Sequence, residues 1–545
     1  MKRSLLSRAD VVLLLAALAA GILFFASLDR LWPLPPIELT ASPDVLVPKA
    51  RAFLIERGFE VTEHAGASRL EVDDPILDYL VRSFGRDATQ EWIREGRAVY
   101  YYLVSFKKEN DPDSYWALLH PLAGVVGWGR TVQEDAPGAR VDIGTARRAA
   151  FAAVEASVGW RLDELTEWGQ TERERPARRD HFFVYEQYLS RTPELRERVS
   201  VTLTGGELTA VRRELVLPES GRREAREREA PVTALQMIGF LSIGLSAVGA
   251  LVVFLTHLQT RKIRLRPAAG LVGVIALFFL TTQALRSADL LRQWDPLWPR
   301  WIATLQSLGI SLAQGAWIAL ALFVVVAAGD ALDREGGGGK GETLWLAVRG
   351  RFFDRRVGVA SLRGFLIGLL CGGALTVTIV LLERVAAAGV AIQPQGFFFF
   401  ALNSDLPALS TLLYFLMVAL VEELGYRFFG GTWLFHLTRR RWAAILIPAI
   451  LYGTAHTGLP FLPPYEPFWG RALAFTVVGC IWGWAYFRWD ALTVVLSHFC
   501  ADLFIFNWPR LGSGDPILVA KAIATIAVPL FPALFLLRVN RDGDA

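Results

Sequence analysis

The chain has 545 residues, of which 53% are hydrophobic, with 18 tryptophans and a mean hydropathy of +0.35. This composition excludes an ordinary soluble enzyme and indicates a polytopic membrane protein. The formal net charge of +4 comes from an excess of Lys and Arg that reports loop orientation in such a protein, and no nucleic-acid-binding motif accompanies it. The three cysteines, Cys371, Cys480 and Cys500, lie in apolar segments, so no disulfide framework is expected.

Residues 1–30 predict an N-terminal transmembrane anchor or signal segment. A basic start with Lys2, Arg3 and Arg8 precedes an apolar run from Val11 to Ala26. Because that run is long for a cleaved signal peptide, we favour an uncleaved anchor. The basic N-terminus is then expected in the cytoplasm, and the residues after the anchor on the outer side.

Residues 31–230 predict a soluble α+β domain inserted on the outer side of the membrane. The segment is polar and contains no apolar run long enough to span a bilayer. Amphipathic helices are expected at 44–58 and 142–155, and each precedes segments with strand-like alternation, as in a duplicated helix-plus-sheet unit. The strands are expected at 98–105, 181–188 and 199–204, with a hairpin turn at 205–206.

The membrane part begins after residues 222–229, an alternation of Arg and Glu that is expected to be a solvated linker. We assign 231–390 to membrane helices and 391–545 to a second group of membrane helices. With the N-terminal segment they make about ten transmembrane helices, and basic clusters on alternate loops place both termini in the cytoplasm. The expected spans are 232–256, 268–285, 301–328, 361–383, 406–430, 442–457, 469–487, 491–507 and 517–537.

The segment from Val421 to Arg427 places two carboxylates and an arginine inside an apolar span. Each such group costs about 2.5–3.5 kcal/mol on insertion scales and therefore needs a function or a partner. Glu423 and Arg427 are four residues apart, so they share one face of a helix and can pair. The adjacent residue, Glu422, points to a different face of the helix and does not take part in this pair. A carboxylate without a partner in a low-dielectric site holds a proton more tightly, as a general base at neutral pH must.

Two later spans carry further polar residues. Tyr452 and His456 are four residues apart, as are His498 and Asp502, so each pair lies on one helix face. A single histidine inside the membrane is as readily explained by a hydrogen bond between helices. Here, however, two histidines, an aspartate and a glutamate without a partner lie on three helices. We therefore expect them to line one shared cavity with a catalytic function.

The order of these motifs resembles the type II CAAX prenyl endopeptidase and bacteriocin-processing family, also called the CPBP or ABI family of intramembrane proteases. The shared pattern is Glu-Glu-x-x-x-Arg, aromatic-x-x-x-His and His-x-x-x-Asn/Asp, and it covers about residues 400–510. Two positions depart from the usual pattern: Tyr452 stands where the family usually has Phe, and Asp502 can carry a charge where Asn would be a neutral donor.

The resemblance implies an endopeptidase in which Glu422 and His456 hold and activate a water. His498 and Asp502 would stabilise the oxyanion, and Glu423 with Arg427 would brace the helix. His-Glu-x-x-His is absent, so the resemblance favours a site without a cofactor. If Zn²⁺ is bound instead, its expected ligands are Glu422, His456 and His498.

The expected partners are the lipid bilayer and a membrane-associated protein or peptide substrate, lipidated or not. The expected location is the plasma (inner) membrane of a bacterium. A second interpretation makes the chain a non-catalytic scaffold, or a maturation or immunity factor, that binds partners through the outer domain. A third interpretation, a transporter with a proton-carrying carboxylate, is weaker because the apolar halves show no inverted repeat.

Overall fold

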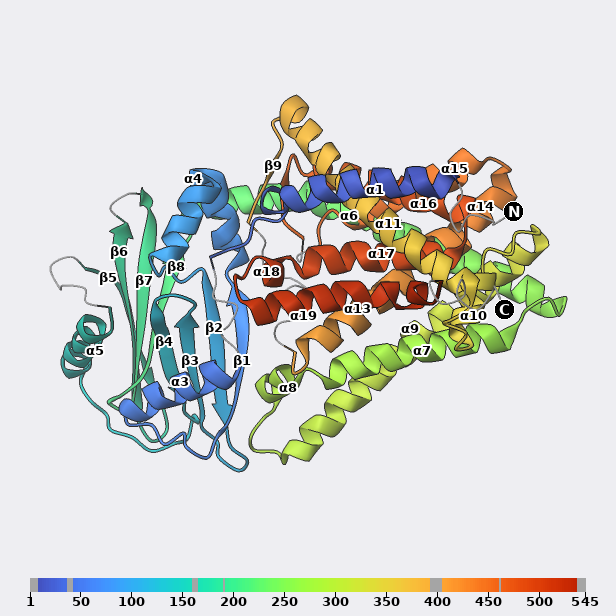
Figure 1. Ribbon diagram of the computed structural model, residues 1–545. Coiled ribbons are helices and arrows are strands. Elements are labelled where there is room, and N and C mark those ends of the chain that lie inside the picture. Colours follow the sequence, from blue (N-terminus) through green and yellow to red (C-terminus); the bar gives the residue numbers. More distant parts are fainter. Residues whose placement is uncertain are drawn as a thin grey trace.

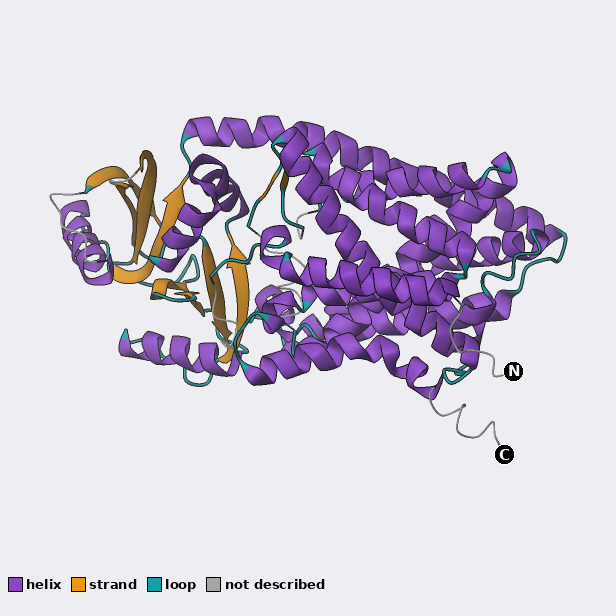
Figure 2. Cartoon of the chain, turned by 45° about the horizontal axis from the view of Figure 1, so that its top comes forward, coloured by secondary structure: helices purple, strands orange, loops and turns teal. Residues whose placement is uncertain are grey.

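The structure, a computed structural model, describes residues 8–36, 43–158, 165–189, 192–392, 404–459 and 462–536. A β-sheet forms one end of the molecule and long, roughly parallel helices form the rest (Figures 1 and 2). Residues 1–7 and Arg538, which the topology prediction uses, lie outside the described residues.

The sheet has eight strands, all antiparallel, in the order β1-β2-β3-β4-β8-β7-β6-β5. Each half is a four-stranded meander, and the halves meet where their last strands, β4 and β8, pair. Two copies of one unit would produce this layout, and the duplication stays a prediction. The strands are β1 (Ala65–Val72), β2 (Tyr100–Lys107), β3 (Ser114–His120), β4 (Gly124–Thr131), β5 (Thr166–Glu174), β6 (Arg179–Leu189), β7 (Thr192–Thr204) and β8 (Glu207–Val216).

One face of the sheet is buried under helices. α3 (Pro43–Glu56) packs on β1, β2 and β3, and α5 (Ile143–Val158) packs on β6, β7 and β8. Cross-strand partners share a face, so the pairing register defines a buried row through seven strands under these helices. From β1 to β6 the row consists of Ser68, Val104, Ala117, Trp128, Val211, Val201 and Phe183.

Residues 222–229, expected to be a solvated linker, are helical and mostly exposed. They belong to the first part of α6 (Glu219–Gln259), a helix of 41 residues that continues into the membrane part. Alternating charges at helical spacing explain this, since Arg228 lies 3.9 Å from Glu224 one turn earlier. The outer domain is therefore joined to the membrane part by a continuous helix.

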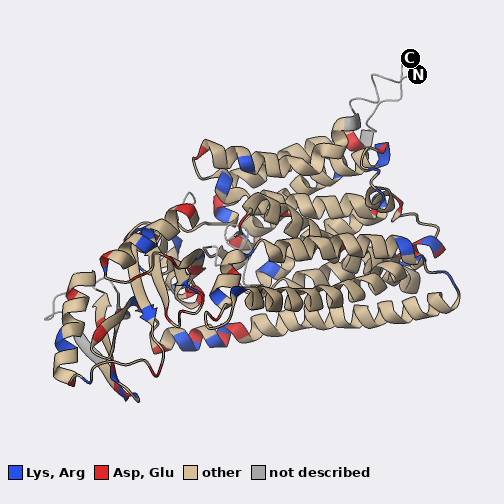
Figure 3. Ribbon diagram, turned by 90° about the horizontal axis from the view of Figure 1, so that it is seen from below, with Lys and Arg blue, Asp and Glu red and all other residues tan. Residues whose placement is uncertain are grey.

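The membrane part has a helix at each position where the sequence predicts a span. In the part of the chain that the structure describes, six helices are long and apolar enough to cross a membrane, and the total of about ten stays unconfirmed. Charged side chains gather around the sheet and at the opposite end of the helices, leaving a mostly uncharged middle (Figure 3). Besides α6, the helices are α1 (Arg8–Ala26), α7 (Leu265–Ala284), α9 (Arg300–Glu335), α11 (Arg355–Ala386), α13 (Pro407–Glu423) with η2 (Leu424–Gly431) and α14 (Thr432–Thr438), α15 (Arg441–Ala455), α16 (Trp469–Arg488), α17 (Ala491–Phe506), and α19 (Pro516–Ala527) with η3 (Val528–Phe535).

Small residues set the spacing around α11, which lies between α1 and α17. A Cβ atom at Gly368 would lie 2.9 Å from Cys500 Cβ, and one at Gly373 would lie 2.5 Å from Ala20 Cβ. Such close approach of backbones is how membrane helices gain packing without a hydrophobic driving force. An ion pair of Arg363 Nε with Asp10 Oδ1 at 3.0 Å also ties α11 to α1. α1 thus packs on α11 as part of the helical bundle, and its interpretation as an uncleaved anchor stays a prediction.

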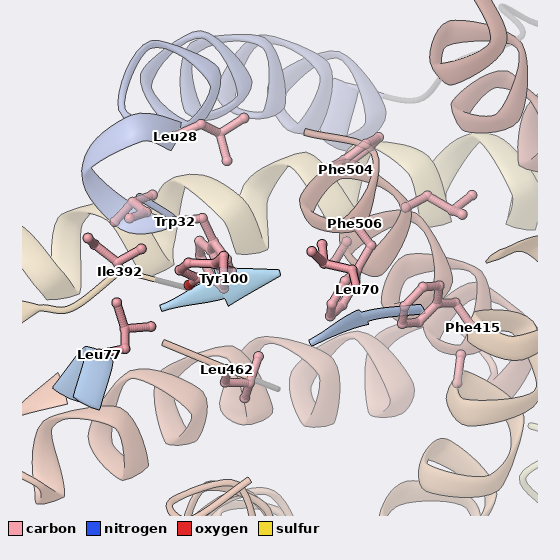
Figure 4. Packing of buried hydrophobic residues seen from close by; sticks show 14 of the residues in the cluster. Leu28, Trp32, Leu70, Leu77, Tyr100, Ile392, Phe415, Leu462, Phe504 and Phe506 are labelled. Carbon is pink, nitrogen blue, oxygen red and sulfur yellow. The ribbon is translucent and has the colours of Figure 1, made fainter. Parts of the chain in front are cut away.

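A continuous apolar cluster joins the sheet end to the helices. Leu70, Leu77 and Tyr100 of the outer domain belong to the same cluster as residues of the membrane helices (Figure 4). From the membrane part the cluster includes Leu28, Trp32, Ile392, Phe415, Leu462, Phe504 and Phe506. The outer domain therefore packs directly on the helices.

We predict that Gly368→Leu destabilises the protein, because the added side chain must displace α17 at Cys500. Overpacking of this kind costs about 1–3 kcal/mol. Thermal unfolding in detergent measures the effect. Gly273→Leu is the matched control, because nothing lies within 4 Å of a Cβ at that membrane-helix position. Equal melting temperatures for the two variants would contradict the tight α11–α17 contact.

Candidate active site

The helix that carries Glu422 and Glu423 changes its winding at these residues. α13 ends at Glu423, and η2, from Leu424 to Gly431, is a π-helix in which α13 continues towards α14. π-Helical turns are rare and occur frequently at functional sites. The motif predicted from the sequence thus lies at a local departure from regular α-helix.

One carboxylate oxygen of Glu423 lies within hydrogen-bond distance of two other side chains. Arg427 Nη1 donates to Glu423 Oε1 at 3.0 Å, and His498 Nδ1 lies 2.8 Å from the same oxygen. The side chains of all three residues are 2–3% exposed. Arg427 Nη2 also donates to the carbonyl of Gly479 at 3.3 Å. Because an ionised carboxylate only accepts hydrogen bonds, His498 donates through Nδ1 and presents Nε2 to the other side of its ring.

Glu422 lies between the two histidines. Its Oε2 atom is 3.7 Å from His456 Nε2 and 3.8 Å from His498 Nε2. These separations exceed a direct hydrogen bond and suit a contact bridged by water. Oε2 is buried without a hydrogen-bond partner in the described part of the chain, although the side chain as a whole is 24% exposed.

The ring of His456 is fixed from three sides. Its Nδ1 atom lies 2.8 Å from the carbonyl oxygen of Tyr452, which can only accept, so Nδ1 carries the hydrogen. Phe475 stacks on the ring at 5.1 Å and 13°, and Tyr452 packs against it at 4.1 Å. Nε2 is therefore left as an acceptor directed at Glu422.

His498 faces Asp502 as well as Glu422. Its Nε2 atom lies 3.5 Å from Asp502 Oδ2, one helical turn further along α17. Trp482 stacks on the imidazole with ring centres 4.2 Å apart and 18° between planes, and its indole N–H donates to Ser497 Oγ. The structure thus brings together the four side chains predicted as catalytic, Glu422, His456, His498 and Asp502, while their roles stay predictions.

These side chains line a cavity of about 670 Å³. Its other walls are mostly apolar and include residues of α6 and α9, such as Phe240 and Trp317, which are 44% and 73% exposed. No pattern in the sequence indicates Phe475, Trp482 or the α6 and α9 walls, because a single apolar side chain in an apolar helix does not stand out from its neighbours.

Within the described ranges, no group of three or more His, Cys, Asp or Glu residues is arranged so that it could hold a metal ion. Glu422, His456 and His498 are the residues that would have to rearrange to bind Zn²⁺, whose ligands lie about 2.0–2.2 Å from the metal.

Comparison with known proteins adds one match. Residues 404–504 match the family described as type II CAAX prenyl endopeptidase Rce1-like. The matched range contains every predicted site residue from Glu422 to Asp502 and excludes the outer domain, α6 and α9. The chain matches none of the curated proteins and none of the solved structures.

We predict different effects on stability for the two adjacent glutamates. Glu423→Gln removes the charge that compensates buried Arg427, and breaking such a pair costs about 3–5 kcal/mol. Glu422→Gln, at a partly exposed side chain without a hydrogen bond at Oε2, should change the free energy of unfolding by less than about 1 kcal/mol. Thermal unfolding in detergent distinguishes the two. A Glu422 variant as unstable as the Glu423 variant would make Glu422 a structural residue.

Proposed function

Because residues 404–504 belong to the type II CAAX prenyl endopeptidase Rce1-like family, we propose that the protein is an intramembrane endopeptidase. It would hydrolyse a peptide bond of a membrane-associated protein or peptide. The observation that carries the proposal is the convergence of Glu422, His456 and His498, with Glu422 Oε2 within 4 Å of both imidazoles.

Glu422 and His456 are proposed to activate the nucleophile. A water between Glu422 Oε2 and His456 Nε2 would donate one hydrogen bond to each, since both atoms are acceptors. The carboxylate removes a proton as the water oxygen bonds to the carbonyl carbon of the scissile peptide. The apolar cavity excludes competing solvent, which strengthens the electrostatic interactions inside it.

His498 and Asp502 are proposed to stabilise the tetrahedral intermediate. Donation by His498 Nε2 to the oxyanion requires that the imidazole be protonated, since Nδ1 already donates to Glu423. Asp502 can donate only as the neutral acid. Each donor aimed at an oxyanion contributes about 2.7–4 kcal/mol.

Collapse of the intermediate completes the reaction. The proton held by Glu422 passes to the nitrogen of the leaving amine, the carbon–nitrogen bond breaks, and the new carboxyl group keeps the water oxygen. Glu422 returns to its ionised form, so the cycle consumes one water and one peptide bond. No serine or cysteine nucleophile enters, and Cys500 is buried in packing contact with α11.

We predict that Glu422→Gln lowers the rate of cleavage by at least ~10²-fold, since general base catalysis contributes about 10²–10⁴-fold. Purified protein in detergent or liposomes, with a membrane peptide library as substrate and mass spectrometry as readout, measures cleavage. Tyr188→Phe, at an exposed outer-domain side chain, is the activity control. Wild-type cleavage by a folded Glu422→Gln protein would remove the general-base assignment and favour the scaffold interpretation.

We also propose that the protein lies in a bacterial plasma membrane with both termini in the cytoplasm. We further propose that the reaction needs no metal ion. Cleavage should then persist after dialysis against EDTA or 1,10-phenanthroline. The same peptide assay tests this, with a chelator-treated zinc protease as the positive control. Loss of activity that added Zn²⁺ restores would instead assign Glu422, His456 and His498 as zinc ligands.

A further inference from the structure

Arg471, in the first turn of α16, is a buried cation whose partners are backbone carbonyl groups. The residue is 5% exposed. Its guanidinium donates to the carbonyl oxygens of Leu459 at 3.3 Å, Leu462 at 2.9 Å and Pro463 at 3.2 Å, and also to that of Thr457. No ion pair of the described residues includes Arg471.

This position is unfavourable for a positive charge on two grounds. A buried cation without a counter-charge has lost its hydration, and the positive end of the helix dipole lies at the first turn of α16. Four carbonyl groups of residues outside the helices and strands offset this cost, since each accepts a hydrogen bond from the guanidinium. A neutral side chain would be easier to bury there, so the guanidinium has a specific task.

The segment that Arg471 holds begins at the candidate catalytic histidine. α15 ends at Ala455, His456 is the first residue beyond it, and Thr457 follows directly. Leu459 and Leu462, whose carbonyls accept from Arg471, also line the cavity. One side chain thus fixes both the backbone next to His456 and part of the cavity wall.

We infer that Arg471 is a positioning residue that holds His456 in its working place through the backbone after it. This inference rests on the proposed function of His456 and adds a residue to it. His456 Nε2 must stay about 3.7 Å from Glu422 Oε2 to share a water with it. A misplacement of only 1 Å costs about 10²-fold in rate when the geometry of attack is set this way.

Glu466, further along the chain after His456, forms ion pairs with the outer domain and with α6. These exposed contacts can be compared with the buried contacts of Arg471. Glu466 of β10 (Tyr465–Glu466) lies 3.3 Å from Arg82 of α4 (Asp74–Arg94) and 3.1 Å from Arg228 of α6. The Glu466 side chain is 54% exposed, and exposed ion pairs contribute little to stability. Positioning of His456 is therefore assigned to the buried arginine.

The test compares Arg471→Met, Arg471→Lys and two controls in the peptide-cleavage assay. Arg471→Met keeps the length of the side chain and removes all donors, so we expect kcat to fall at least tenfold with KM within about threefold. Arg471→Lys should recover part of kcat, because an ammonium group supplies three donors but cannot span four carbonyls. Hydrogen exchange of the amides of residues 456–459 should accelerate in the order wild type, Lys, Met.

Two matched controls separate positioning from general damage. Arg510→Met removes another buried arginine, which donates to Asn507 Oδ1 at 2.9 Å and is not among the donors to the four carbonyls that Arg471 binds. Glu466→Gln removes the exposed tie of the same segment. Both should keep kcat within about twofold of wild type. Should Arg471→Met fail to fold, Arg471→Lys carries the comparison through kcat and hydrogen exchange.

The outcomes decide between the inference and the proposed function. A folded Arg471→Met protein with wild-type kcat and wild-type exchange at 456–459 would overturn the positioning role. If Glu422→Gln cleaves as wild type does, the proposed function itself fails, whatever the Arg471 variants do. Loss of cleavage in Glu422→Gln together with graded loss in the Lys and Met variants supports both.

Discussion

The site depends on a single carboxylate oxygen, Oε1 of Glu423, which accepts from Arg427 at 3.0 Å and lies 2.8 Å from His498 Nδ1. It ties η2 to α17, compensates the charge of Arg427, and fixes which nitrogen of His498 faces Glu422. The pair expected only to brace one helix therefore also orients a residue on another. Because Glu423 pairs with Arg427, Glu422 has no arginine or lysine partner among the described residues, and its Oε2 atom faces the two histidines.

This network requires helices that approach more closely than large side chains permit. A Cβ at Gly479 would lie 3.0 Å from Ala449 Cα, and one at Gly453 would lie 2.3 Å from the carbonyl of Ala472. The backbones of α15 and α16 can touch at these glycines. Arg427 then reaches the Gly479 carbonyl, and the rings of Tyr452 and Trp482 lie 4.7 and 5.3 Å from its guanidinium. The close packing of α15 on α16 thus brings the Gly479 carbonyl and the aromatic rings within reach of the buried Arg427 guanidinium.

Helical spacing predicted the contacts within a helix, since residues four apart share a face: Glu423 with Arg427, and His498 with Asp502. It could not predict the Glu423–His498 contact, which joins residues 75 positions apart through helix packing. No pattern signalled the π-helix either. In the outer domain, alternation marked β2, β6 and β7, whereas β5 is too polar to stand out, and Arg471 resembled an ordinary charge at a helix end.

Hydrolysis inside a membrane requires that water and an extended peptide meet where lipid would otherwise exclude both. The polar side chains lie on α13, on α17 and directly after the end of α15, within the matched segment, whereas the opposite wall comes from α6 and α9. α6 begins at Glu219 beside the sheet and lines the cavity from Phe240 to Ala247. A Cβ at Gly239 would lie 2.4 Å from Ala455, next to His456. One continuous helix, with Pro231 inside it, therefore links the outer domain to the wall of the cavity that faces Glu422, His498 and Asp502.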